Sequence, residues 1–313
     1  MKRLTLGRTG LHVSDLCFGT LNFGWTVSET QAFALLDHYH AAGGNFLHAS
    51  AFSTRGSPSP AMVESSESFV GRWWRDRLVP RDALTLSTRM VLHPWQLQGA
   101  SPLEATLRMR CETALRRMRT SHLDLVLLEW NDALDPIDDA LESLTRLRRA
   151  GLVRYFGAAN FSAWRLVQAL HRALQRGTDR FDAHQIDLSL LSERSALDQV
   201  EAGQAYNLGL LARGPLAGGR LAGPPGTARG LSDRPGGDSA PHTGPQRALR
   251  AAAEREGFTP AQIALAWVMA RGAVPILGVR TSEHLEELLQ ASRLTADGLL
   301  APSSLPTHTH AHV

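Results

Sequence analysis

Residues 123–162 read LDLVLLEWND (123–132), ALDPIDDALESLTRLRRAG (133–151) and LVRYFGAANFS (152–162), and this stretch decides the fold. The two outer segments are short apolar runs of the kind that forms buried strands. The middle segment places apolar residues at helical spacing, with Asp135 as the expected N-cap, Pro136 as the first helical residue and Gly151 as the stop. Two strands joined by a covering helix must run parallel, so the stretch predicts one right-handed βαβ unit.

The same strand-then-helix pattern recurs along the chain. Residues 1–12 alternate around two glycines and predict a short hairpin. Further buried strands are predicted at 13–20, 45–50, 83–90, 183–188, 208–214 and 273–279. Eight units favour an α/β fold of the (β/α)8 TIM-barrel type, with an N-terminal β-hairpin and long loops on the C-terminal face after the second and seventh strands. An open doubly wound sheet is the alternative, but no glycine-rich dinucleotide turn follows the first strand.

Length and composition bound the domain organisation. With 313 residues, 43% of them hydrophobic and 20% charged, we expect a single domain over 1–313 that ends in a disordered tail from about 301. His308, His310 and His312 are interpreted as part of that solvated end, and no metal site is expected.

Charge and cysteine content exclude several classes of partner. The net charge of +3 comes from arginines spread along helical patterns, which argues against nucleic acid as a partner. Cys17 and Cys111 each lie within an apolar pattern, so neither a disulfide framework nor a zinc site is indicated. No apolar run approaches the length of a membrane span. We expect a cytoplasmic protein without a membrane partner, a monomer or weak homo-oligomer acting on a small-molecule substrate.

Ionisable side chains follow three neighbouring strands of the predicted barrel. The active site of such a barrel lies at the carboxyl ends of its strands, where this chain has His48, Arg89 and Glu129. Three ionisable groups at one mouth are costly to desolvate unless they bond to one another or to a ligand, so they are the candidate catalytic residues. The alternative is a plain Arg89–Glu129 salt bridge beside an exposed His48. Candidates for the substrate pocket are Trp130, Phe52 and Asn22.

Several segments together point to one known family. The chain contains, in this order, LGRTGLHVSDLCFGT (6–20), GGNFLHAS (43–50), SES (66–68), LDLVLLEWND (123–132), AGLVRYFGAANFSAW (150–164), GPLAGGRLAG (214–223) and PILGVRTSEHLEELL (275–289). In these segments it resembles the aldo-keto reductase superfamily almost from end to end. The resemblance implies a barrel that binds NADP(H) in extended form and passes hydride to a carbonyl, using a tyrosine acid supported by an aspartate, a lysine and a histidine.

The sequence departs from that catalytic pattern. By resemblance, the family's aspartate falls on His48, its lysine on Arg89 and its histidine on Glu129, while the loop 52–59 that should hold the tyrosine contains none. Realignment does not supply the missing groups, because the only lysine is Lys2 and the only tyrosines are Tyr39, Tyr155 and Tyr206. We therefore expect a divergent member that lacks the usual tetrad, in which classical carbonyl reduction is not the activity.

The resemblance also implies a set of NADP(H) contacts. Asn160 and Gln185 match the amides that hold the nicotinamide carboxamide, and Arg280 and Thr281 match contacts to the 2′-phosphate, for which arginine is well suited. The other implied cofactor residues are Thr20, Gly214, Leu216 and Gly218, the last three in a turn over the pyrophosphate, and Glu287 near the adenine. Departures occur at Ala159, Leu188 and Leu288, where a serine, a stacking aromatic ring and an asparagine are expected.

Three functions remain open. The first is an NADP(H)-dependent oxidoreductase for a carbonyl or conjugated C=C of a medium-sized substrate of specialised metabolism, with Glu129 as proton donor. The second is a redox-neutral dehydration, isomerisation or cyclisation in which His48 and Glu129 are the acid–base pair and Arg89 holds a carboxylate or enolate. The third is a non-catalytic binding protein on the same barrel.

Overall fold

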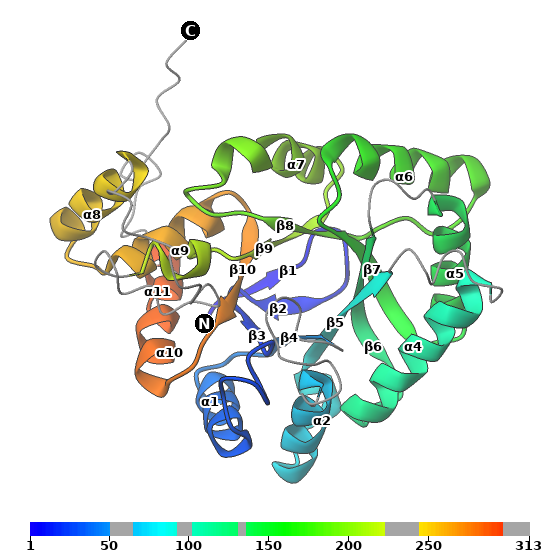
Figure 1. Ribbon diagram of the computed structural model, residues 1–313, viewed down its shortest axis with the longest axis horizontal. Helices are drawn as coiled ribbons and strands as arrows, with labels where there is room; N and C mark the ends of the chain where they lie inside the picture. The colour runs from blue at the N-terminus through cyan, green and yellow to red at the C-terminus, as the bar shows by residue number, and fades with distance from the viewer. Residues whose placement is uncertain (51–64, 93–101, 131–135, 223–243, 297–313) are drawn as a thin grey trace, which may run out of the picture.

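Eight parallel strands close into a barrel in the computed structural model, which describes residues 1–50, 65–92, 102–130, 136–222 and 244–296 (Figure 1). The strands pair in the order β10-β3-β4-β5-β6-β7-β8-β9. Their bounds are β3 Cys17–Gly19, β4 Phe46–Ser50, β5 Thr85–Leu92, β6 Leu123–Trp130, β7 Val153–Ala159, β8 Ala183–Asp187, β9 Gly209–Arg213 and β10 Ala273–Gly278. The predicted (β/α)8 barrel is thus confirmed, and the open sheet is not formed.

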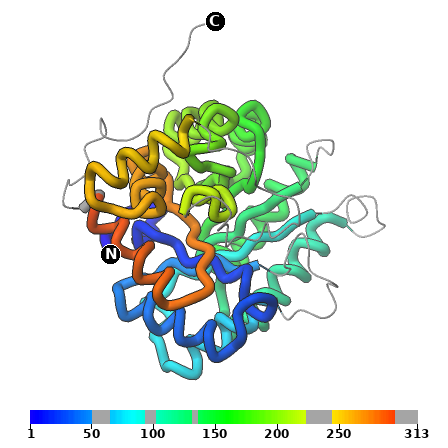
Figure 2. The backbone as a smooth tube through the Cα atoms, turned by 60° about the vertical axis from the view of Figure 1, so that its left-hand side comes forward, coloured from blue at the N-terminus to red at the C-terminus, as the bar shows by residue number. Residues whose placement is uncertain are grey.

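Helices surround the barrel on its outside in both views (Figures 1 and 2). Their bounds are α1 Glu29–Ala41, α2 Ser66–Asp76, α4 Leu103–Met118, α5 Ile137–Arg149, α6 Ala163–Arg176, α7 Glu193–Ala205, α8 Gly244–Glu256, α9 Pro260–Ala270, α10 Ser282–Leu289 and α11 Ala291–Ala296, with short 3-10 turns at Arg81–Ala83 and Ala217–Gly219. Leucine, alanine and phenylalanine side chains from strands and helices fill the layer between them. Within the described residues, no helix combines the length and apolar character needed to span a bilayer.

The N-terminal hairpin covers the amino-terminal end of the barrel. β1 (Arg3–Thr5) pairs antiparallel with β2 (His12–Ser14), as the sequence predicts. Leu6, Leu11 and Val13 pack against inward-facing residues of the barrel, and the hydroxyl of Tyr155 accepts a bond from the backbone N–H of Gly10 at 2.9 Å. The hairpin therefore covers the end opposite to the strand carboxyl ends.

Strand register sets the height of each inward-facing side chain. In a barrel of this type, side chains from alternate strands lie in layers of four. The registers place His48, Leu127, Gln185 and Ile276 in one layer, then Gly19, Arg89, Ala159 and Arg213 in the next, and Ser50, Glu129, Asp187 and Gly278 nearest the mouth. Polar side chains therefore occupy the upper half of the barrel interior.

Helix ends agree with the sequence signals in some places and differ in others. Ser28 and Gln31 form a capping box at the start of α1, and the predicted stop residue Gly151 follows α5 with a φ of +72°. The predicted start of α5 was wrong by one residue: Pro136 is the N-cap, with a ψ of 26°, and the helix begins at Ile137. Gln290 separates the last two helices, α10 and α11. Asp135, the long loops 51–64 and 223–243 and the tail from 301 lie outside the described residues.

Candidate active site

Arg89, Glu129 and Asn160 form a bonded group at the carboxyl ends of β5, β6 and β7. Arg89 Nη1 lies 3.2 Å from Glu129 Oε2, and Asn160 Nδ2 donates to Glu129 Oε1 at 2.7 Å. Asn160 directly follows β7 with a φ of +57°, a left-handed conformation that asparagine tolerates, and this turn brings its amide to Glu129. Both neighbours therefore present N–H groups to the carboxyl of Glu129, Asn160 at Oε1 and Arg89 at Oε2.

The Arg89–Glu129 ion pair is largely shielded from solvent. The side chain of Arg89 is 7% exposed and that of Glu129 is 23% exposed. Burial lowers the pKa of Arg89 and the nearby cation of Arg213 acts in the same direction, while Glu129 opposes both. The sequence-based prediction that Arg89 and Glu129 meet at the mouth agrees with this geometry.

His48 lies one layer deeper and is bonded to other residues. Its Nδ1 is 3.0 Å from Ser87 Oγ, and its Nε2 is 3.1 Å from Gln185 Nε2. Burial, followed by the charge of Arg89, lowers the pKa of His48 to about 3, so the imidazole is neutral near pH 7. The structure thus brings His48 to Gln185 and Ser87, and the exposed His48 of the alternative reading is not found: the residue is 9% exposed.

Sequence reasoning missed a second ion pair at the mouth. Arg213 Nη2 lies 2.8 Å from Asp187 Oδ2, at the paired ends of β9 and β8. The two side chains are 44% and 60% exposed, so this pair is a solvated contact of small energetic weight. The sequence did contain a signal for this pair, because residues two apart on a strand point to the same side of the sheet. Asp187 lies two residues after Gln185, and Arg213 lies two residues after the inward-facing Leu211. The same rule connects Ser87 to Arg89.

The residues assigned to the nicotinamide end fit a carboxamide. Gln185 is 1% exposed, and its Oε1 has no hydrogen-bond partner among the described groups. A buried amide oxygen of this kind is costly unless a donor reaches it, and an amino group of a carboxamide is such a donor. Asn160, the second residue assigned to the carboxamide, donates its Nδ2 to Glu129. Leu188, which stands where the family resemblance expects an aromatic ring, is buried, with 1% of its surface exposed.

The turn after β9 and the start of α10 fit phosphate groups. Gly214, Gly218 and Gly219 have φ values of +63°, +69° and +95°, and Ala217 shares this left-handed region at +50°. Turns of this type can offer backbone N–H groups to phosphate oxygens, and here the N–H groups of Ala217 and Gly219 already donate within the turn, to the backbone oxygens of Gly214 and Leu216. Thr281 caps α10 by accepting from the backbone N–H of His284, which places Arg280 beside a helix N-terminus.

The remaining predicted site residues are more scattered. Thr20 is fully buried and donates to Ser66 Oγ at 3.0 Å, and Glu287 is half-buried on α10. Trp130 packs edge-on against Phe161 with ring centroids 4.5 Å apart, on the helix side of β6, so it is not brought to the mouth. Asn22, also predicted for the substrate pocket, is 5% exposed, and its buried Oδ1 has no hydrogen-bond partner among the described residues. Phe52, the last residue predicted for the pocket, lies outside the described residues.

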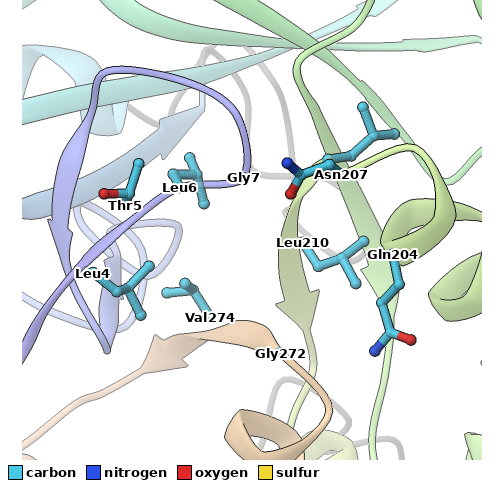
Figure 3. A pocket seen from close by; sticks show the side chains of 10 residues that line it. Leu4, Thr5, Leu6, Gly7, Gln204, Asn207, Leu210, Gly272 and Val274 are labelled. Atoms are coloured by element: carbon cyan, nitrogen blue, oxygen red, sulfur yellow. The ribbon is translucent and has the colours of Figure 1, made fainter.

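A hollow lies at the amino-terminal end of the barrel, away from the candidate active site. It has a volume of about 300 Å³ and is formed between the hairpin and the starts of β9 and β10, with Leu4, Leu6, Asn207, Leu210 and Val274 in its wall (Figure 3). It is separated from Glu129 by the length of the barrel, so it is no part of the candidate active site.

The tyrosines and the lysine lie away from the mouth. Tyr39 donates its hydroxyl to the backbone oxygen of Leu16 at 2.7 Å beneath α1, and burial raises its pKa above the usual value. Tyr155 bonds the hairpin, Tyr206 follows α7, and Lys2 precedes β1. None of these four side chains reaches Glu129 in the described structure, since all belong to the lower end or the outside of the barrel.

The closed barrel agrees with the family resemblance, and comparison with known proteins decides it. A family profile described as "Aldo/keto reductase family" matches residues 15–299. The chain belongs to the aldo/keto reductase family. Membership supports an oxidoreductase with a nicotinamide cofactor, in agreement with the class of enzyme expected from the sequence.

Relatives of this aldo/keto reductase come from bacteria and fungi. The "Uncharacterized oxidoreductase YrpG" of Bacillus subtilis is 30% identical over 313 residues, which cover 95% of this chain and 93% of that protein. The "Norsolorinic acid reductase stcV" of Emericella nidulans is 29% identical over 294 residues, covering 88% of this chain and 73% of that protein. The "Aldo-keto reductase AFTS1" of Alternaria alternata is 25% identical over 322 residues, covering 91% and 86%.

Proposed function

We propose that this protein is an atypical NADP(H)-dependent oxidoreductase that acts on a carbonyl or conjugated C=C of a medium-sized organic substrate. The observation that carries the proposal is the Arg89–Glu129–Asn160 group above a buried Gln185 whose Oε1 lacks a partner among the described residues. The relatives named norsolorinic acid reductases support a substrate of specialised metabolism. The family's usual tyrosine and lysine have no counterpart at this mouth, so the chemistry rests on other groups.

Arg89 is the group suited to stabilise negative charge on the substrate. The nicotinamide, when bound, supplies or removes a hydride. A hydride added to a carbonyl carbon leaves an alkoxide, and one added to the β-carbon of a conjugated C=C leaves an enolate. The guanidinium of Arg89 can donate to either oxygen because it is planar, always charged and held in a largely buried position.

Glu129 is proposed as the proton donor that completes the reduction. In the structure its carboxyl accepts from Asn160 and faces Arg89. A substrate oxygen that binds Arg89 displaces the Glu129 carboxyl from the guanidinium and leaves that carboxyl facing the substrate. When protonated, the carboxyl can deliver its proton to the alkoxide, or to the α-carbon of the enolate, so one hydride and one proton are added in all.

Nucleotide binding and turnover both test the oxidoreductase. Binding to the protein should quench or shift the fluorescence of NADPH. NADPH should also raise the melting temperature of the protein, because a ligand that binds only the native state stabilises it. Glu129→Gln should lower turnover at least about a hundredfold, the usual range for removal of a general acid, while the affinity for NADPH stays within about threefold. Full activity of Glu129→Gln would exclude the role of Glu129, and a protein that neither quenches NADPH fluorescence nor gains melting temperature would exclude the cofactor.

The same ion pair also favours a second candidate. A carboxylate held between Arg89 and Asn160 is suited to act as a base, and Arg89 to hold the resulting enolate, in a redox-neutral elimination or isomerisation. His48 contributes little to such a reaction, because its pKa of about 3 makes the neutral ring too weak a base to take up a proton near pH 7. Turnover that persists without any added nicotinamide and disappears in Glu129→Ala would select this candidate.

A further inference from the structure

The contact between His48 and Gln185 crosses the barrel within one layer. The two residues come from β4 and β8, and His48 Nε2 lies 3.1 Å from Gln185 Nε2. On the other side of the ring, His48 Nδ1 lies 3.0 Å from Ser87 Oγ, in the layer below. The imidazole is therefore held at both nitrogens by neutral hydrogen-bonding groups.

In the series Ser87–His48–Gln185, the orientation of the Gln185 amide determines which nitrogen of His48 carries the proton. The Nε2 group of a glutamine side chain only donates, so the imidazole Nε2 that faces it must accept. A neutral imidazole that accepts at Nε2 carries its proton on Nδ1, and that N–H donates to Ser87 Oγ. The reverse arrangement, with a proton on Nε2, would require the Oε1 of Gln185 to face His48 instead.

The geometry points to His48 as a positioning residue that fixes the Gln185 side chain with its Oε1 turned away from the imidazole and available to a ligand. Gln185 Nε2 is used by His48, while Gln185 Oε1 is buried without a partner among the described groups. The residue thereby turns its acceptor oxygen away from His48 and selects ligands that bring an N–H group to that oxygen.

This role deepens the proposed function and rests on it for the identity of the ligand. The amino group of a nicotinamide carboxamide is an N–H donor of the required kind. The low pKa of His48 agrees with the role, since a charged imidazole would donate from both nitrogens and turn Gln185 around. His48 then acts through Gln185 and takes no part in acid–base chemistry.

The first test reads the tautomer directly and needs no nucleotide. Nitrogen-15 spectra of wild-type protein at pH 7, with the His48 signal assigned by its loss in His48→Asn, should show a neutral ring with the proton on Nδ1. A proton on Nε2, or a charged ring, would overturn the assignment. Because this measurement is made on the protein alone, it decides the state of His48 even if the cofactor proposal fails.

The second test uses a ligand that lacks the donor. The 3-acetylpyridine analogue of NADP⁺ has a methyl group in place of the carboxamide amino group, so wild-type protein should bind it about tenfold more weakly than NADP⁺, the equivalent of one lost hydrogen bond. Affinities are measured by the melting-temperature shift across a titration. Equal affinity for the two nucleotides would contradict the role of Gln185 as an acceptor.

Ser87 variants then connect the selectivity to His48. Ser87→Ala removes the acceptor that holds the proton on Nδ1, so Gln185 is free to turn and the tenfold preference should fall to about twofold or less. Ser87→Thr keeps a hydroxyl and should restore the preference. Ser143→Ala removes a buried hydroxyl on α5, away from the mouth, and should leave the preference unchanged. A preference that stays tenfold in Ser87→Ala would exclude His48 as the positioning group. If wild-type protein binds neither nucleotide, the proposed cofactor is wrong, whereas the tautomer measurement still stands.

Discussion

Two buried histidines show how neighbours decide what a residue can do. His48 and His184 have the same side chain as the exposed His171, but burial lowers their pKa values to about 3 and about 4. An imidazole without a charge can accept and donate one hydrogen bond each, which suits it to orient Gln185 rather than to transfer protons. At the residue scale, the environment of the ring therefore outweighs its identity.

The same pKa values predict a loss of stability in acid. An unfolded histidine binds a proton below a pH of about 6.5, whereas the buried ring stays neutral until the pH falls to the lowered pKa. The free energy of unfolding is therefore highest above a pH of about 6.5 and decreases with pH through the window down to about 4 for His184. Between pH 6.5 and 5, His184→Gln should lose about 2 kcal/mol less of the free energy of unfolding than wild type.

Urea denaturation at several pH values measures this difference. His171→Gln is the control, because an exposed ring on α6 is solvated in both states, and it should follow wild type. Parallel curves for wild type and His184→Gln would show that the buried ring is not linked to folding.

Close packing between elements depends on a few small residues. At Gly71 of α2, a Cβ would lie 2.1 Å from the backbone oxygen of Arg117 in α4. α2 also donates Trp74 Nε1 to the backbone oxygen of Met118 at 2.8 Å, and Glu67 accepts from Thr88 of β5 at 2.6 Å. These contacts hold α2 against α4 and against β5, the strand that carries Arg89.

Gly71→Ala is predicted to destabilise the protein by about 1–3 kcal/mol, because backbone atoms cannot move aside as a flexible side chain can. Ser68→Ala, at a half-buried position of the same helix, should change the stability by less than about 0.5 kcal/mol. The measurement is the urea midpoint at constant slope. A neutral Gly71→Ala would mean that α2 and α4 can separate without loss.

The two ends of the barrel carry different tasks. The hairpin closes the amino-terminal end with apolar side chains, while ionisable side chains collect at the carboxyl end. Closure by the pairing of β10 with β3 joins residues from both ends of the chain into one ring. Stability and chemistry are thus assigned to opposite ends of the same scaffold.

A substitution in the hairpin should therefore separate stability from binding. Leu6 is 1% exposed, and Leu6→Ala should cost about 2–5 kcal/mol through the cavity it leaves. Affinity for NADPH should remain within about twofold, because the site lies at the other end. Leu174→Ala, at an 80% exposed position of α6, is the matched control and should be near neutral. Loss of NADPH affinity in Leu6→Ala, measured below its melting temperature, would show that the two ends are coupled.

The sequence by itself determined the barrel, the hairpin and the meeting of Arg89 with Glu129. These follow from local signals: apolar runs of strand length, helical spacing with stop residues, and the rule that parallel strands end at one mouth. Boundaries such as the start of α5 at Ile137 were less certain, because a proline can occupy either the N-cap or the first turn.

Only the tertiary structure decided which groups His48 and Gln185 touch. The two residues are 137 positions apart, and their height in the barrel depends on the stagger accumulated over every strand between them. No local pattern in the chain encodes that stagger. A shift of two layers would have placed His48 level with Glu129, as an acid–base pair, instead of level with Gln185.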